Sequence, residues 1–182
     1  MPRDRIAMLG DSLTEYNVWT SIDPEAEVIN FGLSGDTTGG MKYRLGRVVL
    51  ANPDLIILQA GINDLSQGRE PSEIVEGHQT IWKSLSDKLP KLKILVCSLA
   101  PLNERMFGWP TATLRNARVL RTNELLCEAA KKAGWDWLDL YGPLSDESGS
   151  LPERFTDDGV HLTAPAYEVW VETLRKWLAD RG

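Results

Sequence analysis

Five apolar runs along the chain alternate with segments of helical periodicity. The runs cover residues 5–9, 27–32, 55–61, 94–99 and 137–141. Most of them are continuous hydrophobics, such as Leu55-Ile56-Ile57-Leu58, with no alternation of apolar and polar residues. Strands that are covered by helices on both faces have this composition, and they belong to parallel sheets. The pattern therefore predicts a parallel sheet of five strands.

The segments between these runs carry the start and stop signals of helices. Asp36-Thr37-Thr38 can cap a helix that ends before Pro53, and Pro71 fits the first turn of the next one. A third helix is expected from about residue 114 to a stop at Gly134, and a last one from about Pro165. Strand–helix alternation with short links predicts right-handed crossovers and a doubly wound, three-layer α/β/α sandwich, with one domain over residues 1–182.

Composition narrows the classes of partner. The 182 residues carry a net charge of −6, and basic residues alternate with acidic ones, which argues against nucleic acid as a partner. No stretch approaches the ~20 apolar residues that span a bilayer. The first residues run into a strand without an apolar leader, which favours a cytoplasmic protein, although a mature chain without its leader would look the same. An assembly of identical chains remains open.

A serine follows the first predicted strand, in Gly10-Asp11-Ser12-Leu13. Gly10 permits a tight turn there, and a serine at the carboxyl edge of a sheet presents its hydroxyl beside free amide groups. The alternative is that Asp11 or Ser12 merely caps the next helix.

Three later segments bring polar groups to the same edge. The second strand ends near Gly32 and Gly35, and the third is followed by Asn63. Before the last helix, an aspartate three residues ahead of His161 can orient the imidazole ring and fix its tautomer. Spacing favours Asp158 for this role, with Asp157 as the alternative.

These segments match four sequence blocks in order, from Gly10 to His161. The blocks are Gly10-Asp11-Ser12-Leu13, Asn30-x-Gly32-x-x-Gly35, Gly61-x-Asn63-Asp64 and Asp158-x-x-His161. The sequence thereby resembles the GDSL (SGNH) hydrolase family, whose fold is flavodoxin-like. The resemblance implies a serine esterase that forms an acyl-enzyme on Ser12, with His161 as base and Asp158 as its orienter. It also implies an oxyanion hole made by the amides of Ser12 and Gly35 and the side chain of Asn63, without metal or cofactor.

Within the family, the second block and the segment from Leu114 to Val119 are similar to the catalytic subunits of intracellular platelet-activating-factor acetylhydrolase. The third block departs from them, because it reads Asn63-Asp64, as in bacterial thioesterase and lysophospholipase members. The platelet-activating-factor substrate is therefore not transferred. The expected substrate is a small-molecule ester, with acetyl esters, longer acyl esters, thioesters and lysophospholipids all open.

The loop at residues 101–110 carries the clearest indication of substrate. Its apolar side chains suggest an acyl pocket or a lid; they are Leu102, Met106, Phe107 and Trp109. Arg105 could contact a polar or anionic head group, and Asp11 is a further candidate for substrate contact. The alternative is a loop folded onto the core or a dimer contact.

Two other functions compete with ester hydrolysis. An acyltransferase would use the same three residues, and a catalytically silent binding module would keep the fold alone. An acyltransferase would transfer the acyl group to added alcohols faster than it hydrolyses the ester. A binding module would not release nitrophenol from p-nitrophenyl acetate.

Overall fold

The computed structural model describes residues 4–107 and 113–180. Its strands form one parallel sheet in the order β2-β1-β3-β4-β5. The strands are β1 (Arg5–Gly10), β2 (Glu27–Gly32), β3 (Leu55–Gln59), β4 (Lys93–Cys97) and β5 (Asp136–Leu138). This is the strand order of flavodoxin-like folds, so the predicted fold class is confirmed.

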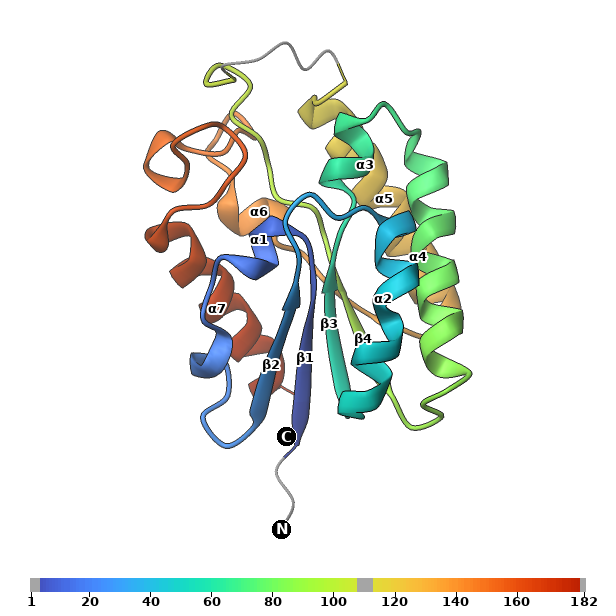
Figure 1. Cartoon of the computed structure of the whole chain (residues 1–182). Coiled ribbons are helices and arrows are strands. Elements are labelled where there is room, and N and C mark those ends of the chain that lie inside the picture. The colour runs from blue at the N-terminus through green and yellow to red at the C-terminus, as the bar shows by residue number, and fades with distance from the viewer. Residues whose placement is uncertain (1–3, 108–112, 181–182) are drawn as a thin grey trace.

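Helices cover both faces of the sheet (Figure 1). On one face lie α2 (Thr38–Ala51), α4 (Pro71–Ser86) and α5 (Asn116–Ala133), and on the other lie α1 (Ser12–Glu15) and α7 (Ala164–Ala179). The short elements are α3 (Ile62–Ser66), α6 (Tyr141–Leu144) and the 3₁₀ turns η1 (Trp19–Ser21) and η2 (Glu153–Phe155). Along the part of the chain that is described, no helix has the length and apolarity needed to cross a membrane.

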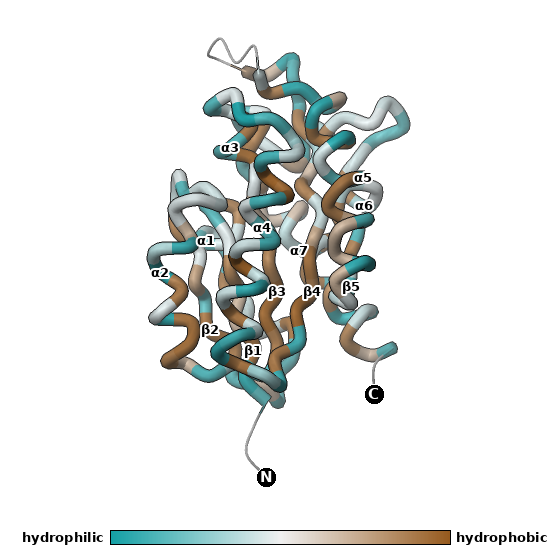
Figure 2. The backbone as a smooth tube through the Cα atoms, turned by 90° about the vertical axis from the view of Figure 1, so that its right-hand side faces the viewer, coloured by the Kyte–Doolittle hydropathy of each residue, from teal (hydrophilic) through white to brown (hydrophobic). Residues whose placement is uncertain are grey.

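Alternate residues of each strand enter separate hydrophobic cores. Met8 and Ile57 pack on the α7 side with Trp170, whereas Leu9 and Leu58 pack on the opposite side. Because side chains alternate between the faces of a sheet, a strand covered on both faces needs apolar residues at every position. The tube in Figure 2 is accordingly apolar along β3 and β4.

The helix boundaries follow the signals in the sequence. The Thr37 side chain accepts a hydrogen bond from the Gly40 amide at the start of α2. Glu70 and Glu73 form a capping box around Pro71 at the start of α4, and Gly134 ends α5 in the left-handed conformation at φ 79°.

Three predicted strands extend too far at their carboxyl ends. The fifth ends at Leu138 rather than at residue 141. The Ser98 hydroxyl accepts hydrogen bonds from the amides of Leu140 and Tyr141, and Asp139 also accepts from Tyr141, so the chain turns into α6. The third strand ends at Gln59 because the chain turns at Gly61, whose φ is 132°, and the fourth ends at Cys97. In each of these runs, strand-forming residues continue beyond the last residue that pairs with a neighbouring strand. Composition alone therefore predicts strands that are too long.

Candidate active site

Ser12 stands at the first position of α1, directly after β1. Asp11 caps this helix, because its carboxylate accepts a hydrogen bond from the Leu13 amide at 3.0 Å. The turn requires glycine at position 10, since a Cβ there would lie 1.9 Å from the Thr14 hydroxyl. The predicted turn and the predicted cap therefore coexist, with Asp11 as the cap and Ser12 left at the edge of the sheet.

His161 joins Ser12 to Asp158. The Ser12 Oγ lies 3.1 Å from His161 Nε2, and His161 Nδ1 lies 2.6 Å from an Asp158 carboxylate oxygen. A carboxylate only accepts hydrogen bonds, so this contact places the ring proton on Nδ1 and leaves Nε2 as an acceptor for the serine hydroxyl. The structure thus brings Ser12, Asp158 and His161 together and leaves Asp157 outside the arrangement.

Asp158 is held in its charged form. Burial raises its pKa, but hydrogen bonds from the His161 ring and from the amides of His161 and Val160 outweigh burial and keep the pKa below its ordinary value. A carboxylate that is ionised and fixed at two oxygens orients the imidazole firmly.

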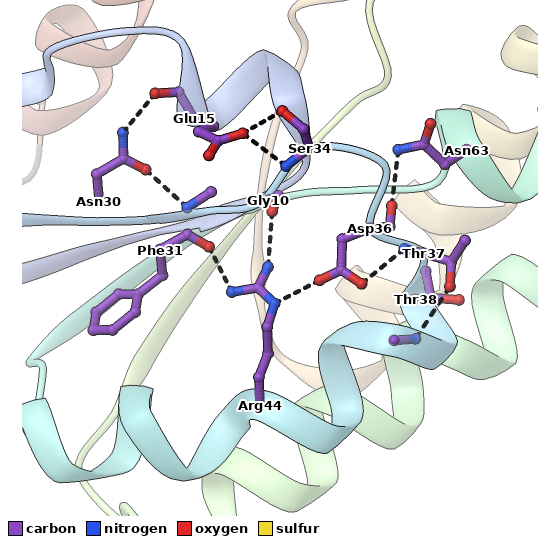
Figure 3. Close-up of polar contacts among 12 residues, drawn as sticks. Gly10, Glu15, Asn30, Phe31, Ser34, Asp36, Thr37, Thr38, Arg44 and Asn63 are labelled. Atoms are coloured by element: carbon purple, nitrogen blue, oxygen red, sulfur yellow. Dashed lines mark hydrogen bonds and ion pairs between the residues drawn. The ribbon is translucent and has the colours of Figure 1, made fainter.

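The glycine and asparagine blocks lie at the same edge. The Asn63 amide donates to the Asp36 carbonyl at 2.9 Å, which joins the start of α3 to the loop after β2 (Figure 3). Gly35 has φ 74°, which favours glycine, and a Cβ there would meet no atom within 4 Å. Gly32 has a packing role, because a Cβ there would lie 2.2 Å from the Glu15 amide nitrogen.

Arg44 is a residue of this edge that the sequence analysis missed. Its guanidinium donates to the carbonyls of Gly10 and Phe31 and pairs with the Asp36 carboxylate (Figure 3). It thereby ties β1, β2 and the following loop together. The available indication was its spacing, because position 44 falls on the same helical stripe as the buried Met41, Leu45 and Val48.

Three further polar residues hold the loops around this edge of the sheet: Thr38, Asp64 and Asn30. Asp64 accepts from both the amide and the hydroxyl of Thr38, at 3.0 and 2.8 Å. Asn30 donates to the carbonyls of Thr14, Glu15 and Asn17, and so fixes the end of α1. These contacts position the candidate site without lying in it.

Two predicted substrate contacts are corrected by their burial. Asp11 is fully buried, and its cap contact holds it away from the surface. Leu102 is 1% exposed and packs in a core cluster with Ile62 and Leu114. Neither side chain is accessible to a substrate.

The rest of the predicted substrate loop lies beside the segment that carries His161. The backbone amide of Asn103 donates to the Gly159 carbonyl at 2.9 Å. The half-buried Phe107 packs against Gly159, where a Cβ would lie 2.9 Å from the Phe107 ring. Met106 is half-buried and Arg105 is exposed. Trp109 lies outside the described residues.

Over residues 4–107 and 113–180, no three or more His, Cys, Asp and Glu side chains form a cluster that could hold a metal ion.

Comparison with known proteins places this geometry in a family. The profile of the GDSL-like lipase/acylhydrolase family matches residues 8–169. The chain is 28% identical over 169 residues to platelet-activating factor acetylhydrolase IB subunit alpha2 of Homo sapiens, covering 89% of this chain and 70% of that protein. The resemblance inferred from the four blocks is therefore confirmed.

Solved structures share the fold. A Streptococcus pneumoniae protein named for platelet-activating factor superposes with a TM-score of 0.88 at 24% identity, covering 97% of this chain and 85% of that one. A lipase/acylhydrolase from Enterococcus faecalis gives 0.81 at 20% identity, with coverages of 98% and 96%. With most of its length matched by the family profile, the chain belongs to the GDSL-like lipase/acylhydrolase family and is an esterase of that family.

Proposed function

We propose that this protein hydrolyses carboxylic esters through a covalent acyl-enzyme on Ser12, with His161 as general base and Asp158 as its orienter. The observation that carries the proposal is the continuous chain of contacts from Ser12 Oγ through the imidazole to Asp158, at 3.1 and 2.6 Å. A serine hydroxyl is a weak nucleophile until such a base accepts its proton.

The reaction has two halves. Ser12 Oγ attacks the ester carbonyl carbon while its proton passes to His161 Nε2, and the carbonyl π electrons move onto the oxygen. When the tetrahedral intermediate collapses, the C–O bond to the alcohol breaks and His161 returns the proton to the departing oxygen. Water then attacks the acyl-enzyme, again losing its proton to His161, and frees the acid and the Ser12 hydroxyl.

The negative oxygen of each intermediate is assigned to three donors: the amides of Ser12 and Gly35 and the side chain of Asn63. The open space at Gly35 supports this assignment, because no side chain blocks approach to its amide. One N–H of Asn63 is fixed on the Asp36 carbonyl, which orients the amide and leaves its second N–H for the substrate.

Short acyl groups are the favoured substrate class within this proposal. Two of the similar relatives, one from Homo sapiens and one from Bos taurus, are named platelet-activating factor acetylhydrolases. Met106 and Phe107 stand on the loop that is bound to the His161 segment, where they can form an apolar wall for the acyl chain. Longer esters, thioesters and lysophospholipids are tested beside acetyl esters.

The test is release of nitrophenol from p-nitrophenyl acetate. Ser12→Ala should abolish it, and Asn63→Ala should lower kcat by ~10²–10³. A fluorophosphonate probe should label one site, located at Ser12 by mass spectrometry. Ser84→Ala, on a helical serine that bonds only within α4, is the matched control and should keep full activity. Labelling elsewhere, or hydrolysis that survives in Ser12→Ala, would contradict the proposal.

A further inference from the structure

Tyr16 is an exposed aromatic residue beside His161. Its ring centroid lies 5.5 Å from that of the imidazole, with the two planes tilted by 33°. Tyr16 is 58% exposed, and the imidazole beside it is itself partly exposed. Its exposed face is therefore available to a bound molecule.

The position of Tyr16 follows from the geometry of α1. Tyr16 comes four residues after Ser12, and its amide donates to the Ser12 carbonyl at 3.1 Å. Residues four apart lie on the same helical face, and side chains lean toward the helix N-terminus. The Tyr16 ring is thus directed back toward Ser12 and His161.

A tether fixes the outer end of the ring. The hydroxyl groups of Tyr16 and Ser34 are hydrogen-bonded at 3.1 Å. Ser34 is itself held by Glu15, which accepts from both its amide and its hydroxyl (Figure 3). Because Ser34 precedes Gly35 directly, the tether joins the base side of the site to the loop of the oxyanion donors. A tyrosine fixed at both ends is a rigid surface.

The direction of proton transfer indicates which part of the substrate contacts the Tyr16 ring. His161 Nε2 must deliver its proton to the departing alcohol oxygen, so the alcohol portion of the ester lies next to the imidazole. Tyr16 flanks the same imidazole. The acyl portion lies on the other bond of the carbonyl carbon and points away from the leaving oxygen.

We propose that Tyr16 is a specificity-determining residue that packs against the alcohol portion of the substrate and selects esters whose alcohol carries a flat apolar group. This inference rests on the proposed function, because it uses the roles given to Ser12 and His161. Flat groups stack on an aromatic face with more contact area than small alkyl groups do.

The test compares benzyl acetate with ethyl acetate, whose alcohols have similar basicity and whose acyl groups are identical. Tyr16→Ala should lower kcat/KM for benzyl acetate by about 10-fold while changing that for ethyl acetate by less than about 2-fold. Tyr16→Phe keeps the ring and should retain most of the preference for benzyl acetate. Tyr43→Ala removes another exposed tyrosine, on α2, and should leave both esters unaffected.

Acyl-enzyme breakdown supplies a second readout. Both esters form the same acetyl-enzyme, so the hydrolysis rate of that intermediate, measured after rapid acetylation, should be unchanged in Tyr16→Ala. An equal fall for both esters would mean that Tyr16 acts on His161 alone and would overturn the inference. Activity that persists in Ser12→Ala would instead overturn the proposed function, so the two failures are distinguishable.

Discussion

At the scale of single residues, Asp11 shows how a motif position can serve the fold. One carboxylate oxygen caps α1, and the other has no hydrogen-bond partner within the described residues. Burial raises the pKa of Asp11 to about 7, against a smaller lowering by the Leu13 amide and by His161, while Asp36 and Asp64 raise it further. The folded protein therefore holds this proton more tightly than the unfolded chain does.

This difference predicts a pH dependence of stability. Because the folded pKa lies above the ordinary value of 3.8, the contribution of Asp11 to the free energy of unfolding falls as pH rises from about 4 to about 7 and is flat above that. Asp11→Asn keeps a capping oxygen but cannot ionise. Its stability relative to wild type should rise by on the order of 1 kcal/mol per pH unit in that window, measured by urea unfolding.

Asp23→Asn is the matched control, since Asp23 also accepts from a neighbouring amide but is partly exposed. A constant difference for Asp11→Asn between pH 5 and 8 would show that Asp11 does not titrate there.

The sequence predicted the three side chains that the structure joins by hydrogen bonds, Ser12, His161 and Asp158, but it did not predict the residues that support them. Ser12, Asp158 and His161 stand in short motifs whose spacing is local, so pattern alone could place them. Arg44 acts across 34 residues of sequence, on Gly10, and such a contact exists only after the strands have paired. The contact between Tyr16 and His161 likewise joins segments that are far apart in the sequence.

At the scale of elements, α2 and α3 are bridged by Thr38 and Asp64. Asp64 is fully buried, and both of its oxygens accept from Thr38. The neighbouring Asn63 donates to the Asp36 carbonyl, so two adjacent residues of α3 bind the start of α2 and the loop that leads into it. This pair of contacts sets the direction of the Asn63 amide.

Thr38→Val should therefore lower kcat more than it changes KM. It leaves one Asp64 oxygen buried without a donor, which costs about 1–3 kcal/mol of stability. Thr38→Ser restores the hydroxyl and should restore kcat. Steady-state kinetics and urea unfolding measure the two effects, and Thr80→Val on α4 is the control for loss of a helical threonine hydroxyl. If Thr38→Val changed KM and left kcat unchanged, Thr38 would not be a positioning residue.

At the scale of the whole molecule, the order of elements was predictable and the ends of strands were not. Apolar runs and helix caps are dictated by local composition, and right-handed crossovers then leave few topologies. Where β5 stops depends on Ser98, a residue forty positions earlier in the chain. Strand ends are set by such tertiary hydrogen bonds, which periodicity does not report.

The core on the α7 side depends on one large residue. Trp170 is fully buried, and its ring lies 4.8 Å from that of Trp19, centroid to centroid. Trp170→Ala should cost about 3–5 kcal/mol, against a total stability of roughly 5–15 kcal/mol for a domain. The midpoint of urea unfolding should fall with an unchanged slope, whereas Leu50→Ala, at a residue 86% exposed, should shift it little. Equal shifts in the two variants would contradict this account of the core.

The Arg44 guanidinium has a consequence for how such enzymes diverge. Its three partners lie at the end of β1, in β2 and in the loop after β2, so the shape of that loop depends on a side chain of α2. A loop transplanted from a relative would keep its shape only if Asp36 and Arg44 were carried over as a pair. New specificities can therefore arise more readily on the loop after β4, where Asn103 bonds instead to Gly159 and Leu151, than on the loop that holds Gly35.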